Sequence, residues 1–376
     1  MTWVFRTACL VSCIAMGGAA AQGRELIYNS LMPPDSVFNK PVMANMISRI
    51  EEQTKGELTV QFNTGGALAG FGDALSAASS GALDVNYIVY AFAESNLPTL
   101  GLINAMYVRD PLVAGPAAAE TVLLNCPQCE AEQERNNIRI ISNVTTEPLT
   151  FICADAEGIT KMEDLKGKRV RSASSAGALI AEAGGTPVNI STAEIYSAMQ
   201  RGQVDCTINV TANLEDFQLW EVAKSITNVS LGTSNGLGMV VFNKSVWESL
   251  TPEHRRVWLD SAAKALAELQ SIYPEEYARV RERATTERDV AFLEPAPGLQ
   301  EGIEEFRARE LPKLVERAKT QGVENPEAIV ENFSAAISKW TAIVDEIGTN
   351  RPWNEEQKAR YAERIQDEIY GKIAVE

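Results

Sequence analysis

The chain has 376 residues, of which 45% are hydrophobic, and its 50 acidic and 34 basic side chains give a formal net charge of −16 at pH 7. A chain of this length exceeds what one hydrophobic core usually holds, so two domains are expected. Nucleic acid is an unsuitable partner, because binding it requires a basic surface. An anionic ligand would be repelled at long range and would need a local cation to hold it.

Residues 1–21 have the pattern of an export signal. Arg6 precedes an apolar, small-residue run that ends in Ala19-Ala20-Ala21. Signal peptidase prefers small residues at these positions, so cleavage is expected before Gln22, and the run is too short to span a bilayer. The alternative is a lipoprotein signal, because the segment ending at Cys13 (LVSC) resembles a lipobox. Export to the periplasm with a cleavable signal peptide is expected, and a lipid anchor at Cys13 stays open as the alternative.

Short β-type runs alternate with helical patterns as far as residue 242. Residues 38–54 read as a helix, with Val42, Met46 and Ile50 on one face. Strands are predicted at residues 25–31, 57–62, 83–89, 138–143, 149–153, 168–171, 187–189, 204–209 and 239–242. This alternation predicts an α/β fold with mostly parallel sheets.

After Ser245 the pattern is helical to the end of the chain. Thr251 and Pro252 suit a helix start. Two later segments carry apolar stripes at helical spacing, with Glu, Lys and Arg on the opposite faces: Ile329, Phe333, Ile337, Trp340 and Val344, then Tyr361, Ile365 and Ile369. They are predicted to be amphipathic helices packed on the body. No low-complexity linker is found, so the chain is expected to cross between domains on ordered segments.

Four cysteines remain after export: Cys126, Cys129, Cys153 and Cys206. An even number in an oxidising compartment favours structural disulfides, although four cysteines allow three pairings. Cys126 and Cys129 form a CxxC motif, but a thioredoxin-like site would need a strand before it and a helix after it. A zinc site would need all four cysteines, two of which lie far away in sequence.

Motifs for catalysis are missing from the sequence. The only histidine, His254, lies in the first turn of a predicted surface helix, whereas a Ser–His–Asp or Cys–His unit needs a histidine beside the nucleophile. Residues 65–72 are glycine-rich but lack both the P-loop lysine and dinucleotide spacing. We therefore expect no catalytic residue, no metal site and no cofactor.

Arg171 is the most informative charge. It ends a predicted strand, and small residues follow it (SASSAG, 172–177). Ligands of open α/β sheets bind at the carboxyl ends of parallel strands, and a guanidinium can grip a carboxylate through two parallel hydrogen bonds. From these residues alone, an ordinary surface ion pair remains the alternative.

Two segments resemble the signature of the substrate-binding proteins of TRAP (tripartite ATP-independent periplasmic) transporters, the DctP-type family. They are residues 163–171 (EDLKGKRVR) and 187–205 (PVNISTAEIYSAMQRGQVD). Weaker matches, in the family's order and spacing, are TKGEL at 54–58, GGAL at 65–68, SGALD at 80–84, WEVAK at 220–224 and WESLTPE at 247–253.

The resemblance implies a periplasmic binding protein fold, in which two α/β domains close over a ligand. Crossing strands and a long helix would join the domains. The expected division is residues 22–150 with 236–278 as the first domain, and 151–235 with 279–376, including the C-terminal helices, as the second.

For the site, the resemblance implies that Arg171 grips the ligand carboxylate and Asn209 hydrogen-bonds it. The family's cleft-lining positions fall on Phe71, Tyr87, Tyr90, Ser174 and Thr192. The second arginine that many members have would fall near Phe151, where this chain has none. A ligand with one carboxylate and an apolar or hydroxylated body is therefore expected.

The resemblance thus implies a non-enzymatic, monomeric receptor that captures a small organic anion and delivers it to the membrane subunits of a TRAP transporter. Two alternatives stay open. One is an exported Cys-dependent redox enzyme, and the other is a binding protein coupled to a sensor.

Overall fold

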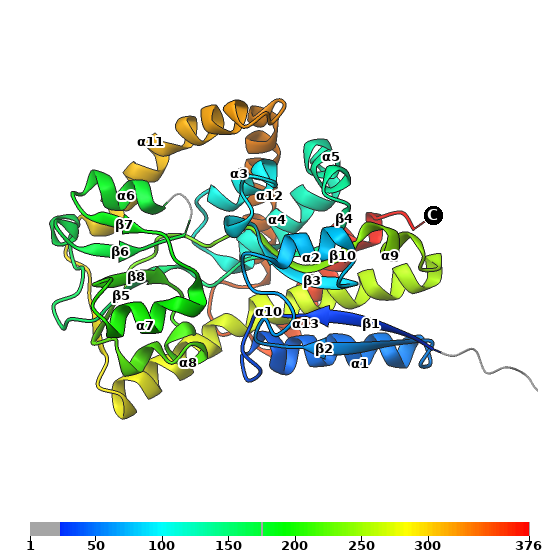
Figure 1. Ribbon diagram of the computed structural model, residues 1–376, viewed down its shortest axis with the longest axis horizontal. Coiled ribbons are helices and arrows are strands. Elements are labelled where there is room, and N and C mark those ends of the chain that lie inside the picture. Colours follow the sequence, from blue (N-terminus) through cyan, green and yellow to red (C-terminus); the bar gives the residue numbers. More distant parts are fainter. Residues whose placement is uncertain (1–22, 174–175, 376) are drawn as a thin grey trace, which may run out of the picture.

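The computed structural model describes residues 23–173 and 176–375 and has two lobes, each built on its own β-sheet (Figure 1). The two-domain α/β architecture predicted from the sequence is confirmed. The predicted export signal, with Cys13 and the cleavage site before Gln22, lies outside the described residues.

The sheet of the first lobe has the strand order β2-β1-β3-β10-β4. The strands are β1 Arg24–Asn29, β2 Leu58–Asn63, β3 Val85–Val89, β4 Ile138–Val144 and β10 Leu237–Asn243. Strand β1 is parallel to β2 and β3, whereas β10 is antiparallel to β3 and β4.

The sheet of the second lobe has the order β11-β9-β5-β8-β6-β7. The strands are β5 Thr150–Cys153, β6 Arg169–Arg171, β7 Thr186–Val188, β8 Cys206–Asn209, β9 Ser225–Thr227 and β11 Ala291–Leu293. Strand β5 is antiparallel to β8 and β9, and the other pairs are parallel.

Both sheets are therefore mostly parallel, as predicted, but each contains one reversed strand, β10 in the first lobe and β5 in the second. The antiparallel pairs arise where the chain crosses between the lobes. It leaves the first lobe on β4 and enters the second on β5, then leaves on β9 and returns on β10. The outgoing and returning strands of each sheet necessarily run in opposite directions.

Two extended segments, residues 145–149 and 228–236, make these crossings side by side. The Leu149 N–H donates to the Gly232 carbonyl at 2.8 Å, and the Leu231 N–H donates to the Leu149 carbonyl at 2.8 Å. The third crossing is helix α10 (Pro252–Glu287), which packs first in the core of the first lobe and then in that of the second. Crossing on ordered segments agrees with the absence of a linker in the sequence.

The remaining helices cover the sheets. Those of the first lobe are α1 Ala44–Gln53, α2 Ala74–Ser80, α3 Pro98–Ala105, α4 Pro111–Leu124, α5 Pro127–Arg135 and α9 Lys244–Glu248. Those of the second lobe are α6 Ala176–Glu182, α7 Ile195–Gln200 and α8 Asn213–Asp216. The C-terminal helices are α11 Leu299–Thr320, α12 Pro326–Ile347 and α13 Glu355–Glu368.

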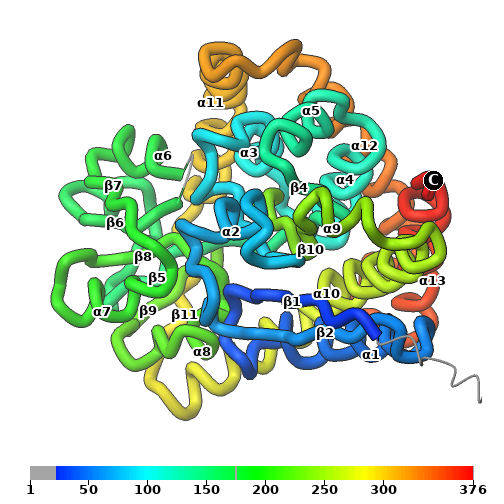
Figure 2. Tube along the Cα trace, turned by 45° about the vertical axis from the view of Figure 1, so that its right-hand side comes forward, coloured from blue at the N-terminus to red at the C-terminus, as the bar shows by residue number. Residues whose placement is uncertain are grey.

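Helices α12 and α13 pack on the first lobe, as the orange and red segments of Figure 2 show. Helix α12 contacts α4, α13 contacts α10, and the buried Trp340 and Tyr361 belong to the first-lobe core. The packing therefore differs from the predicted division, which assigned all of 279–376 to the second domain. The reason is α11, whose Phe306 packs in the second lobe and whose Leu314 packs in the first, so that it carries the chain back.

Three local predictions differ from the structure. Strand β11 interrupts the stretch predicted to be helical throughout, and β9 was not predicted; each has only three residues, too few to show a periodic pattern. The helix predicted at 38–54 is broken near its start, where Lys40 has φ −125° and ψ 111°. Lys40 precedes a proline, and that position disfavours helical backbone.

Candidate functional site

A cavity of about 1280 Å³, its open mouth included, lies between the two lobes. Its walls are largely apolar and aromatic, from Phe38, Phe71, Tyr87, Phe92, Tyr107, Phe217 and Tyr273. The polar side chains among its lining residues include Asn104, Glu147, Arg171, Thr192, Asn209, Asn213, Asp216 and Arg307. Concave, mostly apolar walls with a few placed polar groups are typical of sites for small organic ligands.

Arg171 is the last residue of β6 and only 3% exposed. Its Nε donates to the Ile190 carbonyl at 3.0 Å, and its Nη2 donates to Thr192 Oγ1 at 3.3 Å. Within the described residues it forms no ion pair with a carboxylate. Burial lowers the pKa of Arg171 to about 10, so the guanidinium stays charged at neutral pH. The arrangement is a fixed, desolvated cation facing a cavity.

Asn209 ends β8, the parallel neighbour of β6, so both residues lie at the same edge of the sheet. Its Oδ1 accepts from the Val210 N–H at 2.9 Å and from Asn213 Nδ2 at 2.7 Å. Its Nδ2 is buried and has no hydrogen-bond partner within the described chain. This edge of the sheet thus offers a cation and an amide donor together.

Of the other predicted cleft residues, Phe71, Tyr87 and Thr192 line the same cavity as Arg171 and Asn209. Tyr90 does not: the chain leaves β3 after Val89 and turns, which packs Tyr90 in the core with its hydroxyl against Gly238. Ser174 lies outside the described residues.

Arg307, which the sequence analysis did not single out, also lines the cavity. It comes from α11, and its Nη2 donates to the Leu231 carbonyl at 3.4 Å. Burial lowers the pKa of Arg307. Phe151, near which the resemblance would put a second arginine, is a core residue, whereas Arg307 reaches the cavity from helix α11.

Two acidic side chains in the cavity wall were also missed. Glu147 lies on the first crossing segment, and burial raises its pKa to about 8, with the nearby Glu276 and Asp216 adding to the shift and the Ala212 N–H opposing it. Burial together with Glu276 and Glu215 raises the pKa of Asp216 to about 7. These residues lie on a crossing segment and on a four-residue helix, which carry no motif in the sequence.

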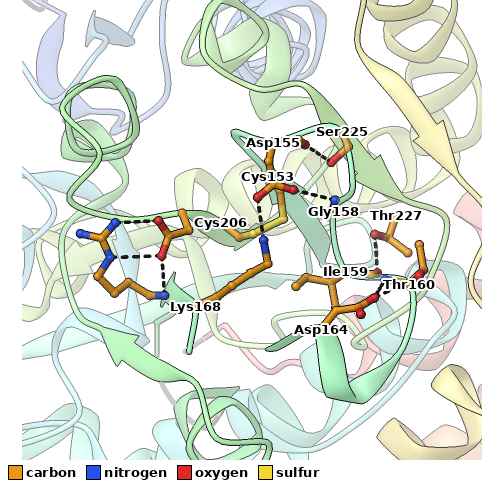
Figure 3. Close-up of a disulfide and its surroundings, with 12 residues drawn as sticks. Cys153, Asp155, Gly158, Ile159, Thr160, Asp164, Lys168, Cys206, Ser225 and Thr227 are labelled. Carbon is orange, nitrogen blue, oxygen red and sulfur yellow. Dashed lines mark hydrogen bonds and ion pairs between the residues drawn. A yellow bond between two sulfur atoms is a disulfide. The ribbon is translucent and has the colours of Figure 1, made fainter. Parts of the chain in front are cut away.

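The four cysteines form two disulfides, as predicted: Cys126 with Cys129 and Cys153 with Cys206. The second joins directly opposed residues of β5 and β8, beside the Lys168–Asp155 ion pair (Figure 3). It lies at the opposite end of the β5–β8 pair from Asn209, which faces Thr150. Its place is therefore in the core of the second lobe, away from the cavity wall.

The CxxC disulfide caps the start of α5, and Cys129 N–H contacts Cys126 Sγ at 3.0 Å. A helix follows the motif, as a thioredoxin-like site would require, but the preceding element is helix α4 rather than a strand. Both cysteines are buried rather than at the surface, with 4% and 0% exposure. Burial limits the access of another thiol, which favours a structural role.

The remaining candidates lie apart from the cavity or are not found. His254 is at the start of α10, where its Nε2 lies 3.1 Å from Glu57 Oε2. Across residues 23–173 and 176–375, no group of three or more His, Cys, Asp or Glu side chains is arranged to hold a metal ion. In the same part of the chain, no helix is both long enough and apolar enough to cross a membrane.

Two lobes joined by hydrogen-bonded crossing segments, with a ligand-sized cavity between them, define a solute-binding protein of the periplasmic type. The model of the family described as bacterial extracellular solute-binding protein, family 7, matches residues 28–308, and the chain belongs to this family. The resemblance to the substrate-binding proteins of TRAP transporters is thereby confirmed. This is a transport family rather than an enzyme family.

Curated relatives are distant in sequence. A solute-binding protein of Albidiferax ferrireducens is 23% identical over 231 residues, which is 60% of this chain and 67% of the relative. The uncharacterized protein YiiZ of Salmonella typhimurium is 24% identical over 249 residues, which is 65% of this chain and 75% of the relative.

Solved structures share the fold over most of the chain. A marine metagenome TRAP solute-binding protein in complex with 3-hydroxybenzoate has a TM-score of 0.75 and 17% identity, covering 85% of this chain and 99% of its own. One from Rhodoferax ferrireducens with benzoate has a TM-score of 0.74 and 15% identity, covering 85% and 99%. Bordetella pertussis DctP6, which binds pyroglutamic acid, has a TM-score of 0.71 and 17% identity, covering 83% and 100%.

Proposed function

We propose that this protein captures a small organic acid in the periplasm, with Arg171 holding the carboxylate, and delivers it to the membrane subunits of a TRAP transporter. The observation that carries the proposal is the buried Arg171 guanidinium, which faces the cavity without a carboxylate partner in the described chain. A buried charge is normally paired, so an anionic ligand is the natural counterion.

The cavity walls favour a compact body with apolar surface. Aromatic side chains line the same cavity as Arg171 and Asn209. The ligands of the structural neighbours (3-hydroxybenzoate, benzoate, pyroglutamate and mandelate) have one carboxylate on a small ring or ring-bearing body and support the same class here. Arg307 adds a second cation to the cavity wall, so dicarboxylates belong in the test.

Binding would close the cleft. The paired crossing segments leave the two lobes connected at one side of the cavity, and a ligand that contacts both lobes stabilises the closed form relative to the open one. The closed form would then dock on the membrane subunits. A sensor as the partner would share every ligand contact, so co-purification with TRAP membrane subunits would separate the two functions.

The first test is a thermal-shift screen with benzoate, 3-hydroxybenzoate, mandelate, pyroglutamate and succinate, followed by titration calorimetry. A ligand at 100 times its dissociation constant should stabilise the protein by about 2.7 kcal/mol. Shifts only with cations, neutral sugars or metal ions would contradict the proposal.

Arg171→Ala is the decisive variant. Removing one partner of a buried charge pair costs about 3–5 kcal/mol, so the dissociation constant should rise by roughly two to three orders of magnitude. Arg169→Ala is the matched control, because Arg169 lies two residues away on the same strand but pairs with Asp205 at the surface. Circular dichroism checks folding. If folded Arg171→Ala binds within threefold of wild type, Arg171 does not hold the ligand.

A further inference from the structure

Two asparagines in the cavity wall present polar atoms without a hydrogen-bond partner in the described chain. They are Asn209 Nδ2, a donor, and Asn213 Oδ1, an acceptor. Both side chains line the cavity, and the residues are 6% and 4% exposed. Buried polar atoms are rarely left unsatisfied, so a partner for each is expected in the working protein.

The orientation of both amides follows from their neighbours. The backbone N–H of Val210 donates to one atom of the Asn209 amide at 2.9 Å, which must therefore be oxygen. That oxygen also accepts from Asn213 at 2.7 Å, which must therefore present its nitrogen there. The two remaining atoms are consequently Nδ2 of Asn209 and Oδ1 of Asn213. Flipping either amide would break these hydrogen bonds. The cavity edge therefore offers one donor and one acceptor that have no partner in the described chain.

Further acceptors lie around Asn213. Glu147 accepts from the N–H of Ala212 at 3.3 Å, one residue before Asn213 in the chain, and Asp216 lies one helical turn after it. Both acidic side chains also line the cavity. The hydrogen-bond donors, Arg171 and Asn209, lie at the ends of β6 and β8. The acceptor oxygens lie on α8, which follows β8, and on the crossing segment that carries Glu147.

We propose that the ligand carries, besides its carboxylate, a hydrogen-bond donor that reaches Asn213 Oδ1: a hydroxyl or a ring N–H. This rests on the proposed capture of a carboxylate by Arg171. Hydroxy acids and lactam acids satisfy both sets of groups, whereas an acid with a purely apolar body leaves the Asn213 oxygen without a partner. Asn213 is then a residue that determines specificity among small organic acids.

The test compares acids that differ only in the donor: 3-hydroxybenzoate and 4-hydroxybenzoate against benzoate, mandelate against phenylacetate, and pyroglutamate against 3-oxocyclopentanecarboxylate, which keeps the ring carbonyl and replaces the N–H by CH2. Titration calorimetry gives each pair's affinity ratio in wild type, in Asn213→Ala and in Ser234→Ala. Ser234 is the control because its hydroxyl also lines the cavity but bonds Asn104. The ratio is the readout, since Asn213→Ala also removes the hydrogen bond to Asn209 and weakens both members of a pair.

In at least one pair, the donor-bearing acid should bind wild type and Ser234→Ala roughly 5- to 150-fold tighter, and this ratio should fall to near one in Asn213→Ala. Affinity ratios below threefold in every pair would overturn the inference, and so would a ratio that persists in Asn213→Ala. Ratios below threefold are the result expected if a protonated Glu147 or Asp216 donates to Asn213 Oδ1 in place of the ligand. In that case carboxylate binding that is lost in Arg171→Ala would still support the proposed function. If no acid binds, both proposals fail.

Discussion

At the level of single residues, the site depends on how Arg171 is held. A guanidinium without such contacts could turn toward the open mouth of the cavity, but here Nε and Nη2 are fixed by the Ile190 carbonyl and the Thr192 hydroxyl. These neutral acceptors orient the side chain without neutralising it. The charge is thus kept available for a ligand, and this local arrangement would be formed before the ligand arrives.

Arg171→Lys should recover only part of the affinity lost in Arg171→Ala. A lysine keeps the charge, but it cannot form two parallel bonds to a carboxylate, and it lacks the Nε that donates to Ile190. We expect the dissociation constant of the best ligand to lie between those of wild type and the alanine variant, measured by titration calorimetry. If Arg171→Lys has the same dissociation constant as wild type, the positive charge alone accounts for carboxylate binding and the paired hydrogen bonds do not contribute.

The sequence could predict Arg171 and Asn209 because Arg171 ends a strand that carries a family motif and Asn209 ends the strand that directly follows the second motif. It could not predict Arg307 or Glu147 as cavity residues. Arg307 belongs to a helix whose local pattern is that of a solvated amphipathic helix, and Glu147 lies in a crossing segment with no periodic pattern. Their burial is decided by which lobe each segment meets, and that is a long-range property.

At the level of elements, strand–helix alternation predicted the fold class, but it did not predict at which strands the chain crosses between the lobes. Local pattern identifies β4, β5 and β10 but does not say that β5 and β10 lie in different sheets from their neighbours along the chain. The same limit applies to α12, whose apolar stripe predicted a packed helix but not the lobe that it packs on. The resemblance supplied the two-lobed plan, and the packing of the last two helices had to come from the structure.

The two disulfides should contribute differently to stability. Cys153–Cys206 closes a separation of 53 residues and Cys126–Cys129 a separation of 3. The chain-entropy model then gives about 4 kcal/mol for the first and about 2 kcal/mol for the second. The double variants Cys153→Ala/Cys206→Ala and Cys126→Ala/Cys129→Ala, compared by urea unfolding without reductant, measure both. A larger loss from the CxxC pair would show that its cap on α5 outweighs chain entropy.

At the level of the whole molecule, the lobes are connected by more than the two crossing segments. Helix α10 passes through both cores, and α11 contacts both from the other side. Any closing motion must therefore bend or shift these helices as well as the two paired crossing segments, residues 145–149 and 228–236. The residues where crossing segments, α8 and α10 meet are thus placed to influence the stability of the whole fold.

Glu147 lies at that meeting point, and it should make stability fall as pH rises. Its pKa is raised to about 8 in the folded protein, chiefly by burial, whereas an unfolded glutamate titrates near 4.3. Between these values the folded state holds a proton that the unfolded chain releases, so the stabilising contribution is complete below about pH 4 and is lost as pH rises through 8. Asp216, with a pKa raised to about 7, acts in the same direction.

Glu147→Gln should therefore flatten the decline in the free energy of unfolding between pH 5 and 8 and raise the melting temperature at pH 8 relative to wild type. The amide mimics the protonated carboxyl and can still accept from the Ala212 N–H, while the remaining slope belongs to Asp216. Glu363→Gln, on the exposed face of α13, is the control for removing one acidic group. Urea unfolding at several pH values decides the matter. If the free energy of unfolding declines with pH as steeply in Glu147→Gln and in Glu363→Gln as in wild type, the pKa of Glu147 is not raised by folding and the prediction is wrong.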